Sequence, residues 1–209
     1  MYKRVDEFER DLTDGISAQA LIQCAQERKL PFRWHPLGFV VCTLFVDGPL
    51  KARLHVWPVD GARSQGSSCQ IHDHVFDLTS RVLLGCIENI EYANDPRGGT
   101  HARYAVEYKN DVSILERTGD TVNLSLSRAT LHEQGSQYRV AAGQLHQSRR
   151  AGLMPAVTAL VTRDVSGNAP TVIGPLDGPV RHEYRRSVLT NSELEKVLTG
   201  ILESKTAST

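Results

Sequence analysis

The spacing of hydrophobic and polar positions changes twice along this chain. Up to about residue 30 the apolar positions have a helical spacing, and residues 17–28 are rich in residues that favour helices. From residue 34 to about residue 163, short apolar or alternating runs are divided by turn-forming residues, which predicts short β-strands. Near the C-terminus a helical spacing returns. Its apolar stripe consists of Leu194, Val197, Leu198, Ile201 and Leu202.

The predicted strands are short and closely spaced, which favours a β-sandwich or barrel over a parallel sheet. Turns are expected at 95–99 and 118–120, and the Gly/Pro-rich residues 164–187 are expected to be irregular. We expect one structural domain made of an N-terminal helical segment (1–33), a β-barrel (34–187) and a C-terminal helix (188–209). The strands are predicted at 38–45, 51–58, 71–76, 80–92, 102–108, 121–127, 136–140, 145–149 and 156–163.

Composition excludes several classes of function. Of the 209 residues, Lys+Arg and Asp+Glu each account for 24, so the formal net charge is zero and no partner nucleic acid or membrane is expected. The chain has no apolar run long enough to span a bilayer, and its first residues are polar, which predicts a cytoplasmic protein. The four cysteines form no CxxC pair and are expected to be free thiols.

The histidines carry the strongest chemical signal. His72 and His74 are two residues apart in a predicted strand, so both project to the same face, whereas Asp73 projects to the opposite face. A distant strand supplies His146, and a closed barrel can bring that strand beside the first one. Three imidazoles on one face can bind a divalent metal ion. A single histidine would more often be an ordinary core or surface residue.

The residues around the paired histidines resemble the first sequence motif of the cupin family. That motif has a glycine, five residues, HxH, three or four residues, a glutamate, six residues and a glycine. Here it extends from Gly66 to Gly85, and Leu78 occupies the glutamate position. The glutamate is commonly a metal ligand in cupins, so its replacement implies a site of three neutral imidazoles.

A second stretch resembles the other cupin motif. It begins at Gly135, has Ala141 in place of the motif proline, retains Gly143 and His146, and has Arg150 in place of the motif asparagine. The two motifs together imply an all-β, single-domain cupin, that is, a double-stranded β-helix or jelly-roll barrel. The N- and C-terminal helices are then expected to pack on its outside.

Within the cupins, the chain is similar to the three-histidine, cysteine dioxygenase-like (thiol dioxygenase-like) group. The run GSSCQIHDH (66–74) resembles GSSIHDH of that group, and MPAVTALVT (154–162) resembles the strand that follows the third histidine there. The resemblance implies mononuclear non-heme Fe(II) and oxidation of a small molecule with O2 as co-substrate. Imidazole also suits Zn, Ni and Cu, so ligand type alone does not select iron. The alternative metals are Zn, Ni and Mn.

Several positions depart from the thiol dioxygenase pattern. Leu160 stands where the group has a histidine, and Thr162 stands near the position of its tyrosine. The early arginine that holds a substrate carboxylate in the group has no counterpart in residues 38–45. Cysteine itself is therefore not the expected substrate, and a larger or less polar molecule is more plausible.

We predict that the substrate pocket is formed by residues from several strands. Tyr138 and Arg150 are weaker candidates for catalytic residues, since a solvent-facing or core-edge position explains each of them better. Asp77 is one residue out of register with the glutamate position and should face away from the metal. The predicted pocket residues are Arg53, His55, Trp57, Phe76, Leu78 and Leu160.

The sequence favours an iron-dependent oxygenase but leaves two alternatives open. A Zn, Ni or Mn cupin could act as a lyase or isomerase, with the metal as Lewis acid. A non-enzymatic cupin could use the histidines to capture a small molecule or a metal. Cupins often pair through their sheets, so a homodimer is a further expectation.

Overall fold

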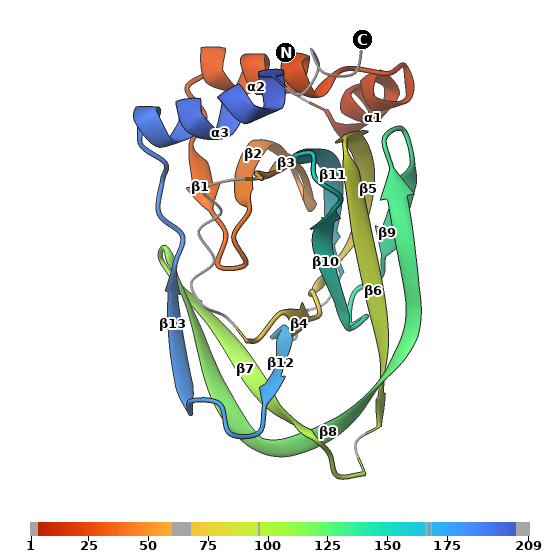
Figure 1. The fold of residues 1–209 in the computed structure, drawn as a ribbon, viewed down its shortest axis with the longest axis vertical. Helices are drawn as coiled ribbons and strands as arrows, with labels where there is room; N and C mark the ends of the chain where they lie inside the picture. Colours follow the sequence, from red (N-terminus) through yellow and green to blue (C-terminus); the bar gives the residue numbers. More distant parts are fainter. Residues whose placement is uncertain (1–3, 60–67, 96, 166, 168, 204–209) are drawn as a thin grey trace.

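The strands of the computed structural model form two antiparallel sheets, and three helices gather at one end of the molecule (Figure 1). The structure describes the chain except residues 1–3, 60–67, 96, 166, 168 and 204–209. Gly66, the first glycine of the first motif, lies outside the described residues. The two sheets enclose a cavity lined by side chains from both. This arrangement confirms the predicted all-β fold class, a single-domain jelly roll formed by two antiparallel sheets.

One sheet has six strands in the order β1-β2-β3-β11-β5-β9. The central strand β11 is buried along most of its length, because the helices cover one face of this sheet and the cavity lies on the other. The strands are β1 (Phe32–Trp34), β2 (Val40–Asp47), β3 (Leu50–Trp57), β5 (Phe76–Leu84), β9 (Gln137–Val140) and β11 (Ala156–Asp164).

The other sheet has seven strands in the order β13-β8-β6-β10-β4-β12-β7. Its longest strand, β8, pairs with β7 and β13 along its first part and with β6 along its second part. The strands are β4 (Ile71–His72), β6 (Cys86–Asp95), β7 (His101–Lys109), β8 (Val112–Glu133), β10 (His146–Ala151), β12 (Thr171–Pro175) and β13 (Arg181–Arg185).

The helices are α1 (Val5–Thr13), α2 (Ala18–Glu27) and α3 (Asn191–Glu203), and they pack on the six-stranded sheet (Figure 1). Phe8 and Leu21 are fully buried against the outer face of that sheet, where Leu54 and Val56 of β3 lie. The helices therefore lie outside the barrel, as the sequence predicts. No helix in the described part of the chain is long and apolar enough to cross a membrane.

Two predictions about local structure were wrong, because pairing with distant strands makes these segments part of a sheet. Residues 164–187, expected to be irregular, contain β12 and β13, which pair with β4, β7 and β8. The turn expected at 118–120 is instead a bulge within β8. These residues lie opposite Arg103 of β7, and the Thr118 hydroxyl donates a hydrogen bond to the backbone carbonyl of Arg103 at 3.2 Å.

The single strand predicted at 80–92 is divided at Gly85 into β5 and β6, which belong to different sheets. Gly85 has φ +69°, and a Cβ atom added there would lie 2.3 Å from the carbonyl oxygen of Pro155. Only glycine therefore fits where the chain passes from one sheet to the other.

Replacing Gly85 by alanine should lower the free energy of unfolding by at least about 2 kcal/mol, since backbone strain adds to a clash with a backbone atom. The matched control is Gly48→Ala. Gly48 also has a positive φ (+58°), but an added Cβ would meet nothing within 4 Å, so this change should cost only about 1 kcal/mol. Urea unfolding measures both, and equal losses would contradict the role of the close contact.

Candidate metal centre

The candidate metal centre begins with two neighbouring strands. His72 on β4 and His146 on β10 are direct cross-strand partners in an antiparallel pair. Side chains of such partners stand on the same face of a sheet. Both imidazoles therefore point into the space between the sheets, although the two residues lie far apart in the sequence.

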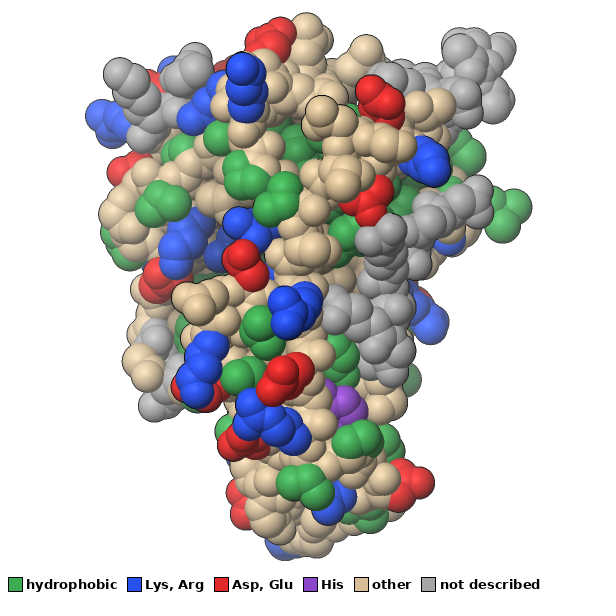
Figure 2. All heavy atoms as spheres, turned by 90° about the vertical axis from the view of Figure 1, so that its left-hand side faces the viewer, with side chains coloured by type: hydrophobic (Ala, Val, Ile, Leu, Met, Phe, Trp, Pro, Cys, Tyr) green, Lys and Arg blue, Asp and Glu red, His purple; other side chains and the backbone are tan. Residues whose placement is uncertain are grey.

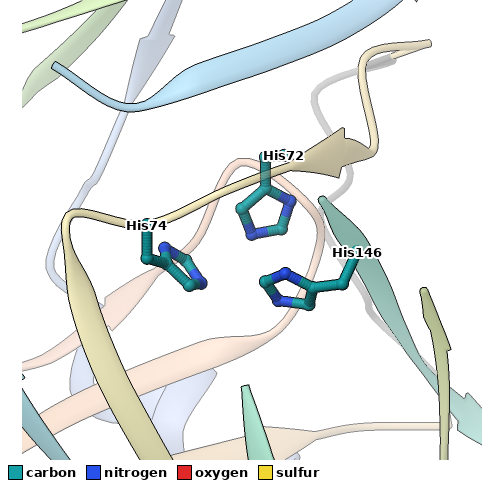
Figure 3. Close-up of side chains that lie close together, drawn as sticks. All are labelled: His72, His74 and His146. Carbon is teal, nitrogen blue, oxygen red and sulfur yellow. The ribbon is translucent and has the colours of Figure 1, made fainter. Parts of the chain in front are cut away.

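His74 completes the group from the segment that leads from β4 to β5 (Figure 3). The ring centroids are 4.8 Å apart for His72 and His74, 4.7 Å for His72 and His146, and 5.0 Å for His74 and His146. Each residue offers one ligand nitrogen, and these nitrogens all lie within 4.8 Å of one another. The three rings converge on one point.

Hydrogen bonds to the backbone orient two of the rings. Nδ1 of His72 is 2.9 Å from the carbonyl oxygen of Gln70, and Nδ1 of His146 is 3.1 Å from that of Gln144. A carbonyl oxygen can only accept a hydrogen bond, so each Nδ1 carries the proton. The lone pair of each Nε2 is therefore available to a metal ion, which is the common arrangement of metal-binding histidines.

The surroundings of the histidines keep them uncharged. Burial lowers the pKa of His146 to about 3, with a smaller contribution from the nearby His72. Burial also lowers the pKa of His72, and it lowers that of His74 well below its ordinary value. All three imidazoles are thus neutral at pH 7, the form that binds metal.

Carboxylates are not part of this group among the described residues. The Asp73 carboxylate accepts a hydrogen bond from the backbone amide of Thr171 at 2.6 Å. The exposed Asp77 carboxylate accepts one from the amide of Ala142 at 2.8 Å, and Asp77 does not line the central cavity. Both side chains are therefore committed elsewhere. The donor set fits a divalent transition metal held by three neutral nitrogens, and it leaves the choice among such metals open.

The histidines open onto a cavity of about 690 Å³. One wall of the cavity is a row of cross-strand neighbours on the six-stranded sheet. In this row Leu160 of β11 pairs with Arg53 of β3 on one side and with Ser80 of β5 on the other. Ser80 in turn pairs with Tyr138 of β9. The cavity is lined by all six predicted pocket residues and by Tyr138, namely Arg53, His55, Trp57, Phe76, Leu78, Tyr138 and Leu160.

Arg150 does not lie near the histidines, contrary to the sequence prediction. It is at the far end of β10 from His146 and does not line the cavity. Its guanidinium donates hydrogen bonds to the carbonyl oxygens of Gly152 and Met154. The motif position is four residues beyond the histidine, and along an extended strand that distance removes the side chain from the centre.

Several polar residues of the cavity had no signal in the sequence, and His35 and Arg186 are two of them. His35 precedes β2, and its ring stacks on Phe39 with centroids 4.2 Å apart. Arg186 follows β13, in the segment expected to be irregular. Neither residue is part of a recognisable motif, so only the folded chain places them in the same cavity as the three histidines.

Comparisons with known proteins provide no family assignment. No family model and no curated protein matches the chain. A solved structure described as that of DMSP lyases resembles it with a TM-score of 0.34 and 14% sequence identity, over 63% of this chain and 51% of that chain. The chain thus spans about half the length of that structure, and a likeness this weak supports no inference about activity.

Removing one ligand should abolish tight metal binding. His146→Ala should weaken the binding of a divalent metal ion by more than about 100-fold, since two imidazoles hold an ion far less well than three. Calorimetry with Fe(II), Zn(II), Ni(II) and Mn(II) under anaerobic conditions measures this. His101→Ala is the control, because His101 lies outside the cavity. Unchanged binding by His146→Ala would contradict the site.

Stability of the metal-free protein should fall in mild acid. Burial, with Arg53 as a second cause, lowers the pKa of His55 from 6.5 to about 3. The unfolded chain therefore binds a proton that the folded state excludes between these values. The contribution of His55 to stability is full above pH 6.5 and is lost as the pH falls toward 3, by up to about 1.4 kcal/mol per pH unit.

Urea unfolding at pH 7.5, 6.0 and 5.0 measures this loss. His55→Leu should show a shallower decline than the wild type, because leucine takes up no proton in either state. His101→Leu should decline as the wild type does. If the decline were identical in all three proteins, His55 would not be its source.

Proposed function

We propose that the protein is a mononuclear non-heme Fe(II) oxygenase, similar to cysteine dioxygenase, that oxidises a small organic molecule with O2. The observation that carries the proposal is the convergence of His72, His74 and His146 without a carboxylate ligand among the described residues. Three neutral ligands leave the full charge of a divalent ion uncompensated and up to three coordination positions open. Bound iron would supply O2 activation and a Lewis-acidic centre for the substrate.

The cavity walls support this function by excluding water next to the histidines. Phe76 stacks on the His74 ring with centroids 4.5 Å apart and an interplanar angle of 12°. Leu78, Val140 and Leu160 form an apolar cluster against which Phe76 packs. Leu78 lines the cavity at the position where the cupin motif has its glutamate. This side of the centre therefore excludes both water and a competing ligand.

Tyr138 is the proposed hydrogen-bond donor to the substrate. Its side chain lines the cavity, and its ring stacks on His132 with centroids 4.4 Å apart. Burial raises the pKa of its hydroxyl, so the group keeps its proton at neutral pH. A protonated phenol held in place by stacking can orient an oxygen atom of the substrate.

The size of the cavity supports a substrate larger than cysteine. Its volume of about 690 Å³ is typical of sites for small organic molecules. Thr43 of β2, which lies in the stretch where the thiol dioxygenase group has its carboxylate-binding arginine, pairs with Arg53 of β3. The arginine of this wall therefore stands on β3 and not on β2.

Oxygen uptake tests the proposal. Protein loaded anaerobically with Fe(II) should consume O2 when mixed with a member of a panel of small thiols, amino acids and catechol-like compounds. His146→Ala should consume none, because it cannot hold the iron, whereas His101→Ala should match the wild type. An oxygen electrode and mass spectrometry of the product provide the measurements.

Two results would replace the oxygenase with another function. Turnover without O2 by protein loaded with Zn, Ni or Mn would indicate a lyase or isomerase that uses the metal as Lewis acid. Tight binding of a small molecule without conversion, with any of the metals, would indicate a non-enzymatic binding protein.

A further inference from the structure

The central cavity contains more cationic side chains than carboxylates. Among the described residues that line it, Arg33, Lys51, Arg53 and Arg186 are cationic, and Asp73 and Asp164 are acidic. On the outer face that carries β13, by contrast, basic and acidic side chains are interspersed (Figure 2).

Salt bridges neutralise two of the cavity cations. Lys51 Nζ lies 2.7 Å from a carboxylate oxygen of Asp164. Arg33 Nη1 lies 2.9 Å from a carboxylate oxygen of Asp111. The remaining cations, Arg53 and Arg186, form no salt bridge with a carboxylate in the described part of the chain.

The contacts of these two arginines hold them in place without compensating their charge. The Arg53 guanidinium carbon lies 5.2 Å from the centroid of the Phe76 ring. That of Arg186 lies 5.0 Å from the centroid of the Tyr108 ring, and its Nε donates a hydrogen bond to the Ser113 hydroxyl at 3.0 Å. Aromatic faces and a hydroxyl orient a guanidinium but carry no net charge.

Arg53 and Arg186 line the same cavity, and the causes of the pKa shifts around them agree with this placement. Burial lowers the pKa of Arg53, and the next cause is the positive charge of Arg186, opposed by Asp164 and Tyr108. Burial also lowers the pKa of His35, with both arginines among the further causes. Two like charges beside a cavity are unfavourable unless an anion lies between them.

The backbone fixes Arg186 at this position. Its amide donates a hydrogen bond to the carbonyl of Asp111 at 2.8 Å, and its own carbonyl accepts one from Arg33 at 3.1 Å. The salt bridge of Arg33 with Asp111 therefore joins the segment after β13 to the turn between β7 and β8. Arg186 thus belongs to an ordered wall of the cavity.

Arg53 and the candidate metal centre are linked through the Phe76 ring. Its guanidinium covers the same Phe76 ring that stacks on His74. A ligand held by Arg53 is therefore one aromatic ring away from the converging imidazoles, within the span of a small organic molecule.

We propose that Arg53 and Arg186 form a clamp for an oxyanion group of the substrate, a carboxylate, sulfonate or phosphonate, while another part of the substrate reaches the ion held by the three histidines. The identity of the ligand as substrate rests on the proposed function, but the clamp does not. Guanidinium groups match such oxyanions through paired N–H donors. Arg53 belongs to β3 of the six-stranded sheet, and Arg186 directly follows β13 of the seven-stranded sheet.

Anion binding by the metal-free protein tests the clamp separately from catalysis. Calorimetry with malonate, methanesulfonate and methylphosphonate should detect binding of at least one of them, and malonamide, which is uncharged, should not bind. The three anions distinguish the class of oxyanion. Arg53→Gln and Arg186→Gln should each weaken this binding by about 10-fold or more.

Arg150→Gln is the matched control, because Arg150 does not line the cavity, and it should bind as the wild type does. Arg53→Lys keeps the charge and should retain part of the affinity, which covers the case in which Arg53→Gln does not fold. The clamp is wrong if the wild type binds none of the anions, if malonamide binds equally well, or if Arg186→Gln binds as the wild type does. None of these results depends on iron or O2, so an inactive enzyme with intact anion binding would refute only the proposed function.

Discussion

The antiparallel pairing of β4 with β10 is the interaction on which the rest of the site depends. β4 has only two residues, and its pairing with β10 on one side and β12 on the other fixes the direction of the His72 side chain. The same pairing places His146 directly opposite His72. The chain then leaves β4 for the other sheet, and His74 lies on that crossing segment. One short strand therefore determines how three imidazoles meet.

One face of the six-stranded sheet contributes to the hydrophobic core, and the other face lines the cavity. On β3, Leu54 and Val56 face the helices and are fully buried, whereas Arg53 and His55 alternate with them and face the cavity. A strand with period two can thus serve an apolar core and a polar cavity together. The helices allow this arrangement because they take up the apolar face and leave the other face available for a ligand.

Burial affects the histidines and the arginines of the cavity differently. An imidazole responds by losing its proton, as the pKa of about 3 for His146 indicates. A guanidinium stays charged, because even a lowered arginine pKa remains far above neutral pH. The cavity therefore combines neutral nitrogen ligands with Arg53 and Arg186 as permanent positive charges. Such a combination favours a metal ion at one point and an anionic group at another.

Local rules predicted the shared face of His72 and His74, the alternation along β3 and the terminal helices, because each depends on spacing within one segment. His146 was predicted from the second motif instead. A capping box begins the C-terminal helix, with the Thr190 amide donating a hydrogen bond to the Glu193 carboxylate at 2.7 Å. Local rules could not predict the remote position of Arg150, the strands within 164–187 or the placement of Arg186 in the same cavity as Arg53. Each depends on which distant strand supplies the hydrogen-bonding partner, and that choice is made only when the sheets close around the cavity.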